Sequence, residues 1–150
     1  AKEKADKWNM KIDFVLMDMK ELAFRREIFD IAAFLGDPIS LFAPAISSAI
    51  FDQVYEILKP GGKIILNYRN WLELVQSSVL KKLGVKTYIN YIDGKISLKH
   101  RRFEFDFYLY APFILEYMLK KSGFVNIETK KFRTDGLILP QVVTIAIKQI

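Results

Sequence analysis

The chain has 150 residues, the size of a single domain, and 51% of them are hydrophobic, which is enough apolar material for a core. No apolar run approaches the roughly 18 residues of a transmembrane helix, so we expect no contact with a membrane. The absence of cysteine excludes disulfides and thiolate metal sites and is typical of a cytoplasmic protein. A single histidine, His100, argues against a His-based metal centre.

The net charge of +6 favours an anionic partner, such as a nucleotide cofactor, a carboxylate substrate or nucleic acid. The basic residues are spread along the chain and are densest at Lys99–Arg102 and Lys120–Arg133. A nucleic-acid footprint is typically a clearer stripe, so we interpret most of this charge as a solvated basic surface.

The first half of the chain predicts strands that alternate with a helix. Residues 1–9 are typical of a helix that has already begun, so we expect the native chain to extend before Ala1. Short apolar runs predict strands at Ile12–Met17, closed by Asp18, and at Phe29–Leu35, closed by Gly36-Asp37-Pro38. Pro44 opens an amphipathic helix that ends before Lys59-Pro60-Gly61-Gly62, and a third strand follows at Lys63–Asn67.

The second half begins with a predicted helix at Leu72–Leu83, stopped by Gly84. Val85–Ile92 and Lys95–Phe107 predict a hairpin around Asp93-Gly94, a favoured two-residue turn. Three further elements complete the prediction: a helix at Pro112–Ser122 and strands at Phe124–Phe132 and Val142–Ile150.

Apolar strands that alternate with amphipathic helices predict an α/β fold in one domain, with a parallel sheet and helices on both faces. In an open α/β sheet, ligands bind at the carboxyl ends of the strands. Asp18, Gly36-Asp37-Pro38 and Arg69-Asn70 each follow a predicted strand, so we expect them along one edge of the sheet. The alternative is that they are ordinary turn formers.

Several stretches resemble class I S-adenosylmethionine-dependent methyltransferases. "KIDFVLMDMKEL" is similar to the segment whose strand-end Asp contacts adenine, and "IFDIAAFLGDPISLF" followed by "VYEILKPGGKIILNYRNW" is similar to the shared central core. "LGDPISLF" and "LNYRNW" favour the small-molecule branch. "LKKSGFVNIETKKF" with "VVTIAIKQI" resembles the reversed last hairpin, so the likeness covers nearly the whole chain.

The resemblance implies a mostly parallel Rossmann-like sheet with a reversed last strand. It implies an inserted antiparallel hairpin, residues 85–107, that covers the acceptor side. Asp18 would accept from the adenine amino group and Met19 would flank the ring, with a helix N-cap as the alternative role of Asp18. Gly36 and Asp37 would lie beside the sulfonium, although relatives often have Asn or Ser near the Asp37 position.

On the acceptor side, Arg69 would bind a substrate carboxylate with its planar fork, or else form a structural ion pair. Tyr68 would help to enclose the site, or else pack in the core. Phe103, Phe105 and Phe107 are interpreted as packing residues, and His100 as a surface residue rather than a base. No residue is assigned as catalytic, because methyl transfer mainly needs alignment.

The family's glycine-rich first turn is absent, since none of the seven glycines forms GxG, and so is the strand whose acidic end holds the ribose. We therefore expect a C-terminal part of the fold, without its N-terminal strands, that binds the cofactor poorly on its own or pairs with another chain, including a copy of itself. A small-molecule methyltransferase is the leading hypothesis. The alternatives are a nucleic-acid methyltransferase and a non-catalytic methyltransferase-like interaction module.

Overall fold

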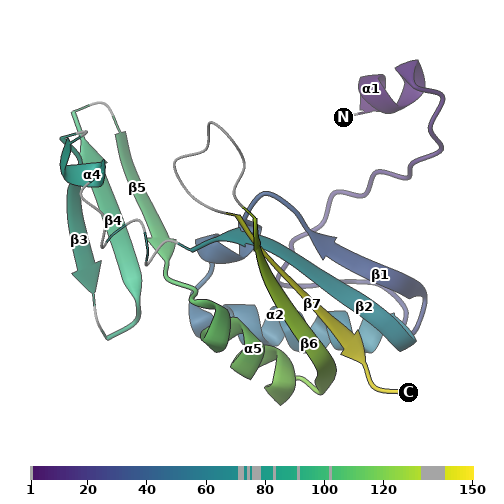
Figure 1. Cartoon of the computed structure of the whole chain (residues 1–150). Helices are drawn as coiled ribbons and strands as arrows, with labels where there is room; N and C mark the ends of the chain where they lie inside the picture. The colour runs from purple at the N-terminus through teal and green to yellow at the C-terminus, as the bar shows by residue number, and fades with distance from the viewer. Residues whose placement is uncertain are drawn as a thin grey trace.

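The computed structural model describes residues 2–150 except 71, 72, 74, 76–78, 83, 91, 102 and 133–140. Its main sheet contains β1 (Phe29–Phe34), β2 (Leu58–Arg69), β6 (Phe124–Phe132) and β7 (Gln141–Lys148), in the spatial order β1-β2-β7-β6 (Figure 1). β1 is parallel to β2, whereas β7 is antiparallel to both of its neighbours. β1, β2 and β6 therefore run in one direction and the last strand is reversed, as predicted, although only one pairing in this sheet is parallel.

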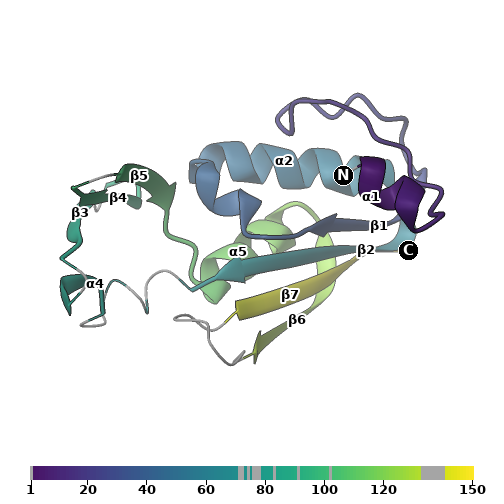
Figure 2. The same ribbon diagram turned by 90° about the horizontal axis from the view of Figure 1, so that it is seen from above.

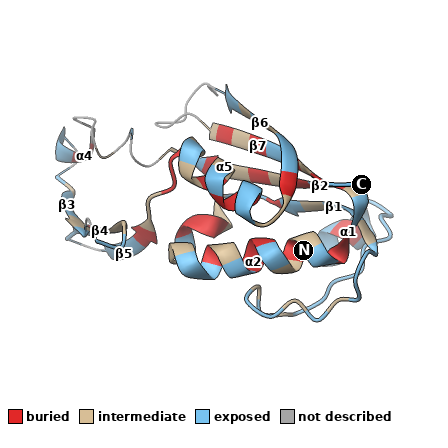
Figure 3. Ribbon diagram, turned by 90° about the horizontal axis from the view of Figure 1, so that it is seen from below, coloured by how far each residue is buried: buried red, intermediate tan, exposed pale blue. Residues whose placement is uncertain are grey.

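Two helices cover one face of this sheet. α2 (Pro44–Ile57) connects β1 to β2, and α5 (Pro112–Lys121) precedes β6 (Figure 3). The inward side chains of the helices and strands form one core cluster, which includes Phe51, Leu115 and Tyr68. The sequence pattern thus predicts α2, α5, β1, β6 and β7 to within two residues, because apolar periodicity and terminal Pro and Gly mark their limits, and it predicts only the central part of β2.

The described residues place helices on only one face of this sheet, whereas the sequence predicted helices on both faces. α2 and α5 lie on the same side, and the opposite face exposes Ile31 and Ile145 to fractions of 55% and 37%. The right-handed connection from β1 through α2 to β2 places α2 on one face only. Apolar residues lie on this exposed face of the strands as well as on the buried one. The sequence pattern is therefore similar to that of strands that are covered by helices on both faces.

The predicted strand at Ile12–Met17 is also wrong. After α1 (Lys2–Lys7), this segment has no regular structure and its side chains are largely exposed, with Leu16 fully so. A strand needs neighbours for its backbone hydrogen bonds, and no described strand pairs with this segment. In Figures 1 and 2 it runs outside the sheet before the chain enters β1.

A second sheet forms a three-stranded meander of β3 (Lys86–Asn90), β4 (Lys95–His100) and β5 (Phe103–Tyr108). The turn near Asp93-Gly94 is confirmed, but Lys95–Phe107 is two strands rather than one, because the chain turns between paired His100 and Phe103. Half of the helix predicted at Leu72–Leu83 lies outside the described residues, and within the described half Val79–Lys82 form α4. Leu80, Ile96, Leu98 and Phe107 make a separate small core.

The Pro-Gly-Gly segment lies inside β2 rather than before it. Phe29 pairs with Leu58 and Ile31 with Lys63, so the residues between Leu58 and Lys63 form a bulge. Gly62 has no room for a side chain, because an added Cβ would lie 2.8 Å from the carbonyl oxygen of Lys59. Glycine is therefore required where the chain leaves α2 and joins the sheet.

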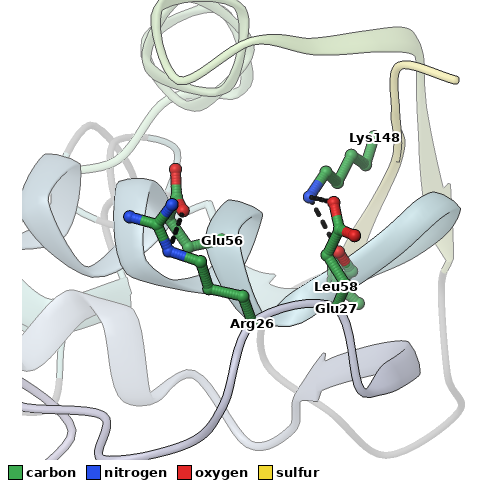
Figure 4. A network of polar contacts seen from close by, with 5 residues as sticks. All are labelled: Arg26, Glu27, Glu56, Leu58 and Lys148. Atoms are coloured by element: carbon green, nitrogen blue, oxygen red, sulfur yellow. Dashed lines mark hydrogen bonds and ion pairs between the residues drawn. The ribbon is translucent and has the colours of Figure 1, made fainter.

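A buried lysine connects the last strand to the start of β1 and β2 (Figure 4). Lys148 Nζ donates to the carbonyl oxygen of Leu58 at 2.8 Å and to Glu27 Oε1 at 3.3 Å, and it lies 4.9 Å from the centre of the Tyr55 ring. The lysine side chain is only 9% exposed, whereas that of Glu27 is 54% exposed. Beside it, Arg26 pairs with Glu56 at 3.0 Å.

Candidate functional site

A pocket of about 410 Å³ lies where the carboxyl ends of β1 and β2 meet β5 of the second sheet. It brings together predicted site residues from two strand ends with two aromatic residues of the meander. The lining residues are Gly36, Asp37, Pro38, Ser40, Leu41, Arg69, Phe105 and Phe107. Such a concave, largely apolar site with a few polar groups is typical of small-molecule binding.

The loop after β1 is shaped by left-handed backbone and held by β2. Gly36 and Asp37 have φ of 85° and 68°, which reverses the chain into the short 3-10 helix η1 (Pro38–Leu41). Asn67 holds both residues, since its side-chain oxygen accepts from Gly36 N–H at 3.2 Å and its carbonyl accepts from Asp37 N–H at 3.1 Å. Asp37 Oδ1 accepts from the Ser40 hydroxyl at 2.6 Å, so the carboxylate has a fixed position.

Arg69 and Tyr68 end β2 and point to opposite faces of the strand. Arg69 is exposed and lines the pocket. Tyr68 is buried, with its hydroxyl 3.1 Å from the Thr144 hydroxyl, and burial raises its pKa to about 12. The structure therefore places Tyr68 in the core behind the strand rather than in the pocket lining.

Asp18 and Met19 lie in a turn that α2 holds. Gln53 accepts from Leu22 N–H at 2.8 Å and donates to the carbonyl oxygen of Lys20 at 2.8 Å. Asp18 Oδ1 accepts from Lys20 N–H at 2.9 Å, and this hydrogen bond lowers the pKa of the exposed Asp18 carboxyl. Its carboxylate is therefore ionised at neutral pH and turned toward its own loop.

Met19 lines a second, adjacent groove of about 490 Å³. All of its lining residues have apolar side chains, Leu22, Leu35 and Val54 among them. Pro38 lines both the groove and the pocket, so the two hollows are neighbours along the carboxyl end of β1. Gly36 and Asp37 line only the pocket, and Asp18 lines neither of the two.

Sequence reasoning missed three contributors. Asn67 and Ser40 fix the loop through hydrogen bonds that only the tertiary structure reveals. Phe105 was interpreted as a packing residue, yet it lines the pocket and is 44% exposed.

His100 is stacked on Phe103 at 5.3 Å between ring centroids and is not among the pocket-lining residues. Within the described residues no three His, Asp or Glu side chains gather as a metal site would need.

Comparison with known proteins agrees with this architecture. A sequence model of the methyltransferase domain family matches residues 1–62. A Pyrococcus horikoshii protein of known structure is similar over 99% of this chain and 65% of its own, with 22% identity and a TM-score of 0.80. An S-adenosylmethionine-dependent methyltransferase from Clostridium acetobutylicum is similar over 99% of this chain and 70% of its own, with 17% identity and a TM-score of 0.71.

A third similar structure contains ligands. The 1,6-didemethyltoxoflavin-N1-methyltransferase of Burkholderia thailandensis, solved with 1,6-didemethyltoxoflavin and S-adenosylhomocysteine, has a TM-score of 0.64 and 15% identity over 99% of this chain and 56% of its own. No curated protein sequence matches the chain significantly. Among the described residues, no helix is both long and apolar enough to cross a membrane.

The comparisons confirm the resemblance to class I S-adenosylmethionine-dependent methyltransferases and their α/β fold. The chain spans less than two thirds of the Pyrococcus horikoshii protein and of the Burkholderia thailandensis enzyme.

Proposed function

We propose that this chain is part of an S-adenosylmethionine-dependent methyltransferase whose acceptor is a small molecule with a carboxylate or another anionic group. One observation carries the proposal. Gly36 and Asp37 from the end of β1 and Arg69 from the end of β2 line one pocket, next to the apolar groove that contains Met19. Ligands of open α/β sheets bind at this edge.

The residues present fit the cofactor. The apolar groove beside Met19 and Leu35 suits the flat adenine ring, and the ionised Asp18 nearby in the chain suits its amino group. When bound, S-adenosylmethionine supplies an electrophilic methyl group on a positively charged sulfur. The Asp37 carboxylate, fixed by Ser40, would place negative charge beside that sulfur.

The acceptor would be held from the other side of the pocket. Arg69 donates through a planar fork, which matches a carboxylate with two parallel hydrogen bonds. Phe105 and Phe107 of β5, which line the pocket, would exclude water, so the meander of residues 85–107 would cover the acceptor side. No base is assigned, because a general base is needed only if the acceptor must lose a proton.

The cofactor assignment predicts an effect at Asp18. Replacing Asp18 with Ala in the full-length protein should weaken S-adenosylhomocysteine binding by about 2- to 12-fold, the effect of losing one hydrogen bond. Titration calorimetry measures this, with the exposed Asp13→Ala in the same segment as the matched control. Equal affinity of Asp18→Ala and wild type removes Asp18 from the site. A full-length protein that does not bind S-adenosylhomocysteine overturns the proposed function.

The acceptor assignment predicts an effect at Arg69. In a methyl-transfer assay with a panel of carboxylate acceptors, Arg69→Lys should lower kcat/KM about tenfold although the positive charge is kept, because lysine lacks the fork geometry. Arg101→Lys is the control, since Arg101 is exposed and is not among the pocket-lining residues. An unchanged kcat/KM for Arg69→Lys, or an acceptor without an anionic group, decides against this role.

A further inference from the structure

The second sheet has two faces of opposite character. On one face of β5, Glu104 pairs with Lys99 at 2.6 Å and Asp106 pairs with Lys95 at 2.7 Å. Side chains alternate between the two faces of a strand, so the other face of β5 carries its aromatic residues, Phe103, Phe105 and Phe107. The cross-strand ion pairs stabilise the pairing of β4 with β5 and gather the charged groups on the face opposite the aromatic residues.

Burial decreases along this aromatic row. Phe107 is 1% exposed and belongs to the small core of the second sheet, whereas Phe105 is 44% exposed. The two rings lie 5.8 Å apart with 31° between their planes. Phe105 thus rests against a fixed ring on one side while much of its own surface remains accessible.

Phe105 differs from Phe103, the other exposed phenylalanine of β5, because it lines the pocket. Phe105 and Phe107 line the pocket, but Phe103, which is 50% exposed on the same strand, does not and is stacked on His100 instead. The lining is therefore divided between an aromatic surface from β5 and three polar residues: Asp37 and Ser40 from the loop and η1 that follow β1, and Arg69 at the end of β2. An accessible phenyl ring inside a pocket offers a surface for offset or edge contacts with another aromatic ring.

We propose that Phe105 determines acceptor specificity, and that the acceptor carries a planar aromatic ring joined to its anionic group. The ring packs against Phe105 and the anionic group points to Arg69. The volume of about 410 Å³ accommodates a one- or two-ring acid together with the methyl-donating end of the cofactor. This inference rests on the proposed function and adds the class of acceptor to it.

The test compares two acids that differ mainly in aromaticity. Benzoate and cyclohexanecarboxylate have the same charge and nearly the same size, and their dissociation constants are measured by ligand-observed saturation-transfer NMR on the full-length protein. Wild type should bind benzoate about three- to tenfold more tightly, the range of an aromatic pair beyond simple burial. Phe105→Leu should abolish this preference while it retains an apolar side chain of similar volume.

Phe103→Leu is the matched control, since it changes an equally exposed phenylalanine of the same strand, and it should keep the preference for benzoate. Thermal melts of both variants check that the fold is intact. The proposal is overturned if wild type has no preference, if it binds neither acid, or if Phe105→Leu keeps the preference. A measurement of S-adenosylhomocysteine binding distinguishes a failure of the proposed acceptor class from a failure of the proposed methyltransferase function. Cofactor binding without a ring preference refutes only the acceptor class, whereas a Phe105-dependent preference without cofactor binding refutes only the methyltransferase assignment.

Discussion

Replacing Phe51 with Ala should lower the free energy of unfolding by about 3–5 kcal/mol, the usual cost of removing a buried phenyl ring. Phe51 is fully buried on α2 and contacts the ring of Phe34 edge-on at 6.4 Å between centroids. Phe34 ends β1, directly before the loop that carries Gly36 and Asp37. The substitution thus leaves a cavity beneath the strand end that supports the pocket, and urea denaturation followed by circular dichroism measures its cost.

Phe113→Ala provides the comparison for Phe51, because it deletes the same ring from α5 at a position that is 68% exposed. It should change the free energy of unfolding by less than about 0.5 kcal/mol. If the two variants were equally stable, α2 would not pack on the sheet in the way described.

Lys148→Ala should lower the free energy of unfolding by about 2–4 kcal/mol, the second-largest loss among the substitutions proposed for this protein. The substitution removes the donor to the buried carbonyl of Leu58, the ion pair with Glu27, and the contact with the Tyr55 ring. It also leaves the space of the lysine stem unfilled. Urea denaturation again measures the loss, and Lys130→Ala is the control, since Lys130 lies on β6 with a side chain that is 71% exposed.

Two further variants separate the contributions at Lys148. Lys148→Met keeps much of the stem volume, so its stability should lie between that of wild type and Lys148→Ala. Glu27→Gln keeps an acceptor at a half-exposed position and should cost less than about 1 kcal/mol. A larger loss for Glu27→Gln than for Lys148→Ala would show that the ion pair, rather than the bond to Leu58, secures the last strand.

Elements whose limits depend on local chemistry could be predicted from sequence. Pro44 begins α2 and Pro112 begins α5, and apolar alternation gives the buried strands β2 and β7. Ile12–Met17 has an equally apolar pattern but forms no strand, because strand formation depends on neighbours that lie elsewhere in the chain. A pattern of side chains cannot indicate whether those neighbours are present.

The candidate site was predictable only in part for the same reason. Gly36, Asp37 and Arg69 were expected at one edge because they follow strands of a parallel pair, and all three line one pocket. Tyr68, one residue before Arg69, necessarily faces the opposite side and enters the core. Phe105 reaches the pocket only because the second sheet lies against the end of the first, and no local pattern in the sequence encodes that approach.

The two separate hydrophobic clusters imply that the molecule has two cooperative units. The small cluster around Ile96, Leu98 and Phe107 shares no buried residue with the large one, so we expect the meander to open by sub-global fluctuations at a lower free energy than global unfolding. In a hydrogen-exchange experiment, amide protons of β4 should then exchange with solvent before those of β2. One wall of the pocket should therefore be only as stable as this small unit, while the wall that carries Arg69 belongs to the sheet of the large core.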